Sequence, residues 1–110
     1  MPLLEKVRIE VFIPDLPDPI YNRLLDELGD ELTYSLGGCT VTPTRGKYRC
    51  ASGLISPDQV NILYTDTPFQ WEEDAVVIEQ YAQELRNVVE RALEKEEAVL
   101  VALHSVFHVD

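Results

Sequence analysis

Residues 98–103 read Ala98-Val99-Leu100-Val101-Ala102-Leu103, and every side chain in this run is apolar. A strand with one face in water alternates apolar and polar residues, so a strand that is apolar on both faces must be covered on both. In a chain of 110 residues the simplest second cover is another molecule or a ligand. The run therefore predicts a sheet with helices on one face and a further contact on the other.

Upstream of this run, strand and helix patterns alternate. Val7, Ile9, Val11 and Ile13 have the period of a half-buried first strand. Asp18-Pro19 is a typical helix start and Gly37-Gly38 a typical helix end, with leucines at helical spacing between them. A second strand follows from Cys39 to Cys50, and Gly46 is a candidate bulge within it.

Ala51-Ser52-Gly53 reads as a hairpin turn before a third strand that contains Val60, Ile62 and Tyr64. We expect this strand to begin only after Pro57, because proline cannot donate to a sheet ladder. The second helix has two candidate starts, a capping box at Thr67-Gln70 or the acidic turn Trp71–Asp74. The fourth strand is predicted to begin near Ala98.

The order strand-helix-strand-strand-helix-strand predicts an α+β, ferredoxin-like βαββαβ fold. It consists of a four-stranded antiparallel sheet in the spatial order 4-1-3-2, with two helices on one face. We expect residues 1–110 to form one such domain, because a chain of this length builds a single core without metal or disulfide support.

The composition excludes several partners. The formal net charge is −11, which disfavours nucleic acid and anionic membranes as partners. No run of about 20 apolar residues and no signal peptide is visible, so we expect a cytoplasmic protein with Cys39 and Cys50 reduced. The two cysteines are too few for a zinc site. On a strand, His104 and His108 lie about 13 Å apart, too far to share a metal. No metal and no cofactor is therefore expected.

The face opposite the helices is the first candidate site. If Val7, Ile9 and Val11 lie under the helices, then Arg8, Glu10 and Phe12 face the other way, and we expect Asn61, Leu63 and Thr65 to join them. Either Ala98, Leu100, Ala102 and His104 or Val99, Val101 and Leu103 complete that face. An apolar patch of this kind favours a homodimer closed through the sheet, with Phe12, Leu63 and Leu100 at the interface.

Two stacked sheets can also enclose a pocket, and Arg8, Glu10 and His104 would be its polar contacts. His104 is then a candidate acid or base. The structural alternative is that Arg8 and Glu10 form ion pairs and His104 lies at a wet strand end.

Arg45, Lys47 and Arg49 form the second candidate site, with Tyr48 beside them. At period two their side chains share one side of a strand, provided that Gly46 does not break the phase. They could bind a small anionic ligand such as a carboxylate or phosphate. Two alternatives are protection of an edge strand from aggregation, and contact with the acidic second helix of a partner subunit.

Gly37-Gly38-Cys39-Thr40-Val41 and Arg45-Gly46-Lys47-Tyr48-Arg49 resemble short motifs of a group of small bacterial proteins of unknown function, in which a "G-x-T-V" strand precedes a "G-x-W-R" element. Tyr48 stands where that group has tryptophan, and its glutamate-rich strand after the turn is not matched by Ser56-Pro57-Asp58-Gln59. The resemblance covers about a third of the chain, implies a ferredoxin-like fold and implies no activity.

Three functions fit these patterns. The first is a homo-oligomeric binding or interaction module that uses the open sheet face or the basic strand. The second is a small-molecule enzyme of the dimeric α/β-barrel type, with Arg8, Glu10, Tyr48 or His104 in a pocket between sheets. The third is a subunit of a larger assembly in which the acidic second helix docks on a basic partner.

Overall fold

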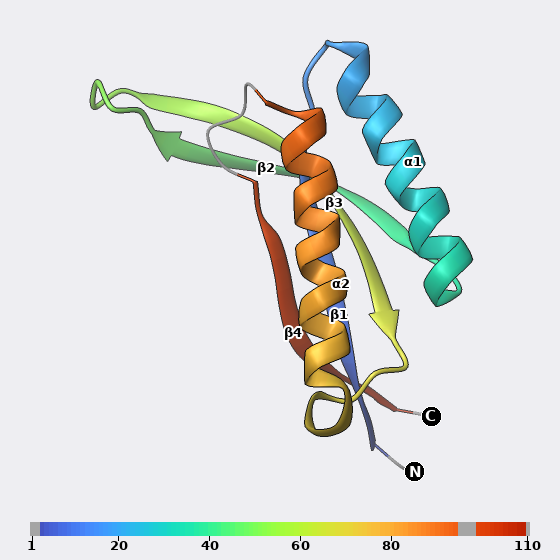
Figure 1. Ribbon diagram of the computed structural model, residues 1–110. Helices are drawn as coiled ribbons and strands as arrows, with labels where there is room; N and C mark the ends of the chain where they lie inside the picture. The colour runs from blue at the N-terminus through green and yellow to red at the C-terminus, as the bar shows by residue number, and fades with distance from the viewer. Residues whose placement is uncertain (1–2, 95–98, 110) are drawn as a thin grey trace.

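The computed structural model describes residues 3–94 and 99–109, which form four strands and two helices (Figure 1). In chain order these are β1 (Leu3–Pro14), α1 (Pro19–Leu36), β2 (Thr40–Arg49), β3 (Ile55–Thr67), α2 (Trp71–Ala92) and β4 (Val101–Val109). All neighbouring strands are antiparallel, in the order β2-β3-β1-β4, and both helices lie on one face of the sheet. The ferredoxin-like prediction is confirmed. Ala98, where the fourth strand was expected to begin, lies outside the described residues.

The core lies between the helices and one face of the sheet. Alternate residues of β1, from Val7 to Ile13, are completely buried there. The helices supply one stripe each: Leu24, Leu28 and Leu32 from α1, and Ile78, Ala82, Leu85 and Val89 from α2. These stripes follow helical spacing, so burial of the apolar faces holds the two layers together.

The ends of α1 are set by local chemistry, as the sequence predicts. The Asp18 carboxylate accepts a hydrogen bond from the backbone N–H of Ile20 at 3.0 Å, and Pro19 occupies the first helical position. Gly37 ends the helix with a φ of 96°, a left-handed conformation that glycine adopts without strain.

The second helix begins at the later of its two candidate starts. Gln70 precedes the first turn, and the Asp74 carboxylate accepts a hydrogen bond from the Gln70 N–H at 3.1 Å. The Thr67 hydroxyl donates to the Val7 carbonyl of the neighbouring strand at 2.9 Å and accepts from the Phe69 N–H at 3.2 Å, not from Gln70, so the capping box at Thr67 does not form. In the part of the chain that the structure describes, no helix is long and apolar enough to cross a membrane.

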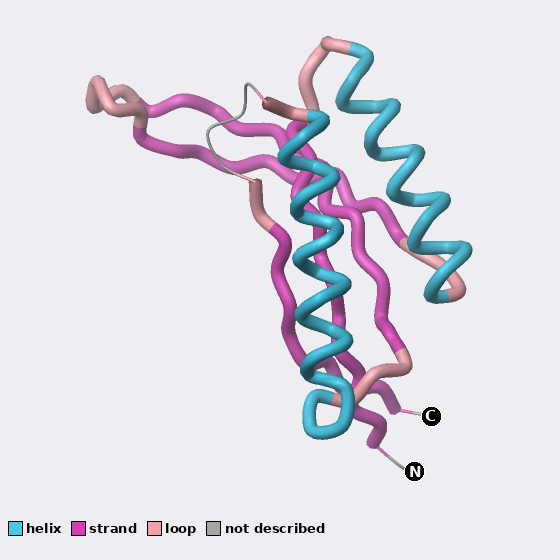
Figure 2. The backbone as a smooth tube through the Cα atoms, viewed as in Figure 1, coloured by secondary structure: helices cyan, strands magenta, loops and turns pink. Residues whose placement is uncertain are grey.

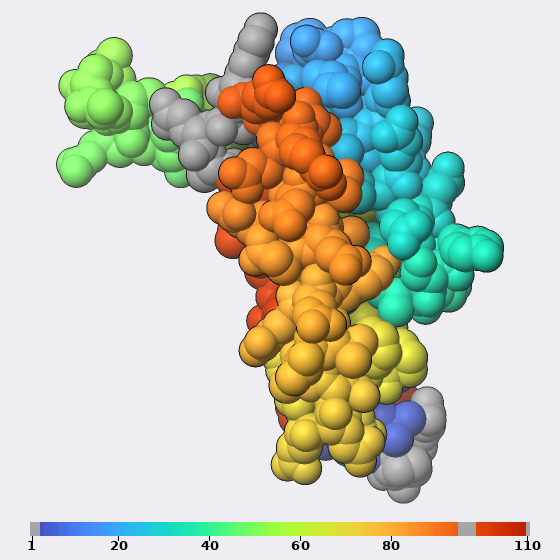
Figure 3. Space-filling model, viewed as in Figure 1, coloured from blue at the N-terminus to red at the C-terminus, as the bar shows by residue number. Residues whose placement is uncertain are grey.

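The distal half of the β2–β3 hairpin, residues 45–59, extends beyond the helices as a two-stranded ribbon that we call the arm (Figures 2 and 3). Because of it the molecule measures 49 × 25 × 22 Å, and its radius of gyration is 15.3 Å. A compact domain of about this size has a radius of gyration near 13 Å. The ladder runs in unbroken register from Thr40 to Arg49, so the bulge predicted at Gly46 is absent.

The third strand also begins earlier than the sequence predicts, at Ile55, with Pro57 inside it. Pro57 lies opposite Lys47 in the arm. In a two-stranded ribbon the second edge of each strand is unpaired, so a residue without an N–H is tolerated at that edge.

Candidate functional site

The open face of the sheet, on the side without helices, carries a compact polar network. Register places Asp66, Arg8 and His104 side by side on β3, β1 and β4, and places Tyr64 and Glu10 in the next row. Side chains directly opposite or diagonal on one face of a sheet are within reach of each other. The structure therefore brings together Arg8, Glu10 and His104, three of the residues that the sequence proposes for this face.

Arg8 and Asp66 form the centre of this network. Arg8 Nε lies 2.6 Å from Asp66 Oδ1 and Arg8 Nη2 lies 2.9 Å from Asp66 Oδ2, which is a two-pronged, charge-assisted contact. The guanidinium also lies over the Tyr64 ring, 4.3 Å from its centre. His108 reaches across β1, so that its Nε2 lies 2.9 Å from Asp66 Oδ2. The Asp66 carboxylate therefore contacts both Arg8 and His108.

These contacts shift the acid–base balance of the pair. The hydrogen bonds from Arg8 lower the pKa of Asp66 more than partial burial raises it, and the contact with His108 lowers it further. The same hydrogen bond raises the pKa of Arg8 above its ordinary value. At neutral pH the pair is therefore fully charged and fixed in place.

His104 and Glu10 form a second contact, with His104 Nε2 2.9 Å from Glu10 Oε1. The Glu10 side chain is 19% exposed and that of His104 is 45% exposed, so the histidine is the member open to solvent. A carboxylate that orients an imidazole is a common arrangement for proton transfer, provided that a substrate lies against the other ring nitrogen. The arrangement equally fits a structural ion pair across neighbouring strands.

Outside this network the open face is mixed: Phe12, Ile62 and Leu100 are apolar, whereas Lys6 of β1 and Thr42 and Thr44 of β2 are polar. One prediction about this face is wrong. Leu63 is completely buried, opposite Val11, under the helices, together with Asn61 and Thr65. Leu63 is therefore a core residue and not an interface residue. The third strand has the opposite phase to the one predicted, and it places Ile62 on the open face beside Phe12.

The fourth strand resolves the choice of rows left open by the sequence. Val99, Val101 and Leu103 pack against the core, so Leu100, Ala102 and His104 lie on the open face. The backbone of Leu100 accepts a hydrogen bond from the Phe12 N–H at 3.1 Å, and its side chain is 53% exposed. Phe12 and Leu100 are thus neighbours on this face, and their place in an interface stays a prediction.

The second candidate site lies on the arm. Register places Arg45, Lys47 and Arg49 on one side of the ribbon and Tyr48 on the other, so Tyr48 does not line the same surface. All four side chains are exposed. No described residue forms an ion pair with the three basic side chains. We call Arg45, Lys47 and Arg49 the basic row.

Neither cysteine is paired. Cys39 lies just before β2, where its Sγ is 3.5 Å from the Gly29 carbonyl oxygen, while Cys50 lies in the turn of the arm. Eleven residues of extended chain separate them by about 36 Å, too far for a disulfide. Within residues 3–94 and 99–109, no three His, Cys, Asp or Glu side chains converge as metal ligands would.

Two hollows lie on the surface of the described residues, one beside the polar network and one between the helices. One, of about 410 Å³, lies at the α1–β2 turn and is lined in part by Gly38, Thr40, Tyr64 and Asp66, so it opens beside the polar network. The other, of about 260 Å³, lies between α1 and α2 and is mostly apolar. Both are open to solvent.

Sequence reasoning missed Asp66, Tyr64, His108 and Ile62 as members of the open face. Three of the four belong to β3 and were missed because the predicted phase of that strand was wrong. The fourth, His108, reaches the network only by crossing β1. One signal in the sequence could have recovered them. Arg8 is one of few cations in an acidic chain, and an aspartate opposite it in the neighbouring strand satisfies it best.

Comparison with known proteins supports the fold. The structure is similar to CutA from Synechococcus elongatus PCC7942, with 14% sequence identity and a TM-score of 0.55, over 96% of this chain and 85% of that one. It is also similar to a phage SAM lyase in complex with S-methyl-5′-thioadenosine, with 13% identity and a TM-score of 0.53, over 96% of this chain and 90% of the lyase. No protein-family model matches the sequence, and the search of curated proteins found no match. The fold implied by the sequence resemblance is confirmed.

Proposed function

We propose that this chain is a homo-oligomeric interaction module of the cytoplasm that associates through its open sheet face, in the simplest case as a homodimer. The phase of β3 is the observation that carries the proposal. The strand buries Leu63 between Asn61 and Thr65 and leaves Ile62 and Tyr64 half-buried on the open face. Ile62 and its neighbours Phe12 and Leu100 are available for a contact there, because burial of apolar side chains is the main favourable term in most protein–protein association.

The polar residues of the open face support the same function. Arg8, Asp66 and His108 satisfy one another, and Glu10 satisfies His104, so these groups keep their partners when water is removed. Burial of charges that already have good geometry costs much less than burial of unpaired ones. The face therefore combines the exposed Leu100 and the half-buried Phe12 and Ile62 with a polar centre that a second sheet can cover.

Native mass spectrometry and light scattering after gel filtration test this proposal. We expect the native protein to form a homodimer and a Phe12→Asp/Leu100→Asp variant to be a monomer, because two carboxylates would be desolvated in the interface. Val77→Asp is the matched control, since Val77 is 50% exposed on α2, away from the sheet face. A monomeric native protein, or a double variant that remains dimeric, contradicts the proposal.

A pocket between two stacked sheets is the second candidate function, and the Glu10–His104 contact favours it. In this arrangement Arg8 binds the negative end of a small substrate and His104 exchanges a proton with it. The same mass spectrum tests this function, because an enclosed ligand adds mass to the dimer. Loss of that added mass in Glu10→Gln/His104→Ala, with the dimer retained, supports the pocket. A dimer without added mass favours the pure interaction module.

A further inference from the structure

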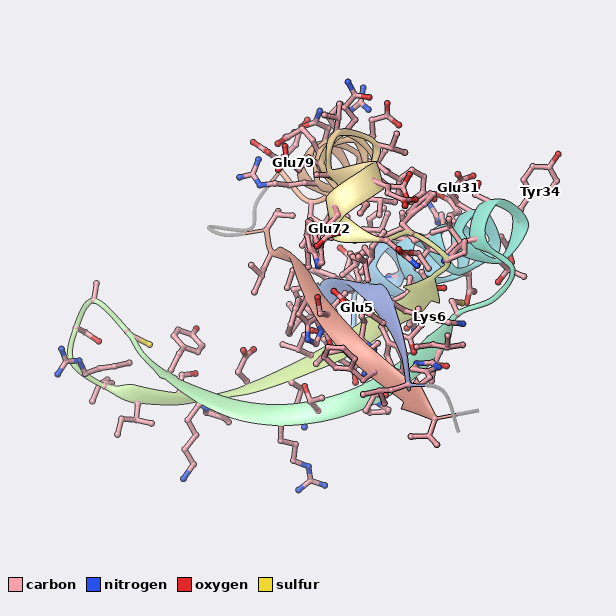
Figure 4. The ribbon with its side chains drawn as sticks, turned by 90° about the horizontal axis from the view of Figure 1, so that it is seen from below. Glu5, Lys6, Glu31, Tyr34, Glu72 and Glu79 are labelled. Atoms are coloured by element: carbon pink, nitrogen blue, oxygen red, sulfur yellow. The ribbon has the colours of Figure 1, made fainter. Side chains whose placement is uncertain are left out.

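The groove between α1 and α2 has an apolar floor and acidic walls. Leu24 and Leu28 from α1 and Leu85 and Val88 from α2 line its floor, and Glu27, Glu31 and Glu84 line its walls. Its volume is about 260 Å³. Tyr81 closes one side, with its hydroxyl 3.4 Å from Glu31 Oε1, and burial raises the pKa of Tyr81. Figure 4 shows Glu31 on the α2 side of α1, whereas Tyr34 points away from the molecule. We call this surface the acidic groove.

The charge of the molecule is divided between the helices and the arm. α1 holds four carboxylates and one arginine, and α2 holds six carboxylates and two arginines. The arm holds three of the nine basic residues of the chain and only Asp58 as an acid. Surfaces of opposite sign attract each other during encounter and fix the orientation in which two molecules meet.

One side of the arm matches the acidic groove in polarity as well as in charge. Register places Ile55 and Pro57 of β3 beside Arg49 and Lys47, so apolar and basic residues occupy the same side of the ribbon. Ile55 is 71% exposed. A two-stranded ribbon alone in water is marginally stable, so the arm gains order when this side is covered.

The spacing of the charges also matches. Successive basic side chains in the row are about 6.7 Å apart, because every second residue of a strand points to the same side. Glu27 and Glu31 are one helical turn apart, which is a rise of about 6 Å. Two neighbouring cations of the row can therefore face both carboxylates of α1 at once.

We propose that the arm of one copy binds in the acidic groove of a second copy. The contact is intermolecular, because the arm leaves the molecule on the side away from α1 (Figures 1 and 3). Ile55 and Pro57 cover the apolar floor, and the basic row pairs with the walls. Donor and acceptor surfaces differ, so this contact is separate from the sheet-face association and joins copies into a ring or a chain.

Charge reversal with complementation tests the inference. The arm variant is Arg45→Glu/Lys47→Glu/Arg49→Glu, and the groove variant is Glu27→Lys/Glu31→Lys/Glu84→Lys. Both are made in the Phe12→Asp/Leu100→Asp background, so that the sheet face does not contribute. Sedimentation velocity measures association of each variant alone and of the two mixed, at protein concentrations well above those of the native mass spectrum in which this background is expected to be a monomer. The matched control is Asp26→Lys/Asp30→Lys, which makes the same type of charge change on exposed positions of α1 outside the groove.

We expect each reversed variant alone to associate about tenfold more weakly than the Phe12→Asp/Leu100→Asp parent, and the equimolar mixture to regain the affinity of the parent. Both reversed surfaces are complementary in the mixture, so restored binding also shows that the variants are folded. An increase in salt from about 50 mM to about 500 mM should weaken the parent contact. A parent that stays monomeric at these higher concentrations, a mixture that does not associate, or an equal effect in the Asp26/Asp30 control overturns the inference. None of these results depends on the sheet-face dimer.

Discussion

Asp66 is the residue whose replacement tests the open-face network most directly. It accepts two hydrogen bonds from Arg8 and contacts His108, and its side chain is only 17% exposed. A hydrogen bond to a charged group contributes about 1.5–3 kcal/mol when it is well buried, and partial exposure reduces this value. We therefore expect Asp66→Asn to lower the free energy of unfolding by about 2 kcal/mol at neutral pH. For a domain of this size that corresponds to about 8 °C in melting temperature.

The pH dependence identifies the cause of this loss. Because the folded-state pKa of Asp66 is depressed, its contribution is fully present above the unfolded-state pKa, about 3.9 for aspartate. The contribution is lost as the pH falls through the folded-state pKa. The difference between the native protein and Asp66→Asn should thus still be present at about pH 5 and should shrink at lower pH.

Urea unfolding at a fixed protein concentration, followed by circular dichroism between pH 7 and acid, measures this difference. Asp58→Asn is the matched control, because Asp58 lies on the same side of β3 and has no ion pair among the described residues. We expect it to change stability by less than about 0.5 kcal/mol. A loss at Asp66 that is independent of pH would refute the reasoning, since the charge of the carboxylate would then play no part.

Three further outcomes are expected. Leu63→Ala should lower the free energy of unfolding in urea by about 2–5 kcal/mol, because it leaves a cavity in the core. A loss below about 1 kcal/mol would show that Leu63 is not a core residue. Gly37→Ala should destabilise the fold by about 1 kcal/mol at its left-handed φ, whereas Gly38→Ala should have little effect by thermal melting. If the basic row binds an anion, phosphate should raise the melting temperature of the native protein more than that of Arg45→Ala/Arg49→Ala, and equal shifts would remove that site.

The fold could be predicted from the sequence because its signals are local. Alternation in β1, the Asp18-Pro19 start and the glycine end of α1 each depend on a few neighbouring residues. The start of α2 was ambiguous for a non-local reason. The Thr67 hydroxyl bonds to the Val7 carbonyl of another strand, and sequence spacing does not report that contact. The arm was not predicted, because its length depends on where the helices stop covering the sheet.

The candidate site was only partly predictable. Arg8, Glu10 and Phe12 follow from the phase of β1, which its four buried apolar residues determine. The phase of β3 does not follow in this way, because pattern reasoning places the more apolar row against the nearest helices. Here Leu63 is a single large apolar residue between Asn61 and Thr65, and register with β1 puts all three in the core.

The wrongly predicted phase of β3 is informative, because the observed phase places an apolar side chain on the open face, as the doubly apolar fourth strand also does. Both β3 and β4 present apolar side chains on the side without helices, Ile62 and Leu100, and the charged groups between these strands are paired with one another. Two strands thus contribute to one apolar patch beside Phe12. An apolar patch next to internally paired charges suits contact with a second copy, and this agreement favours the sheet face over the arm as the first contact to form.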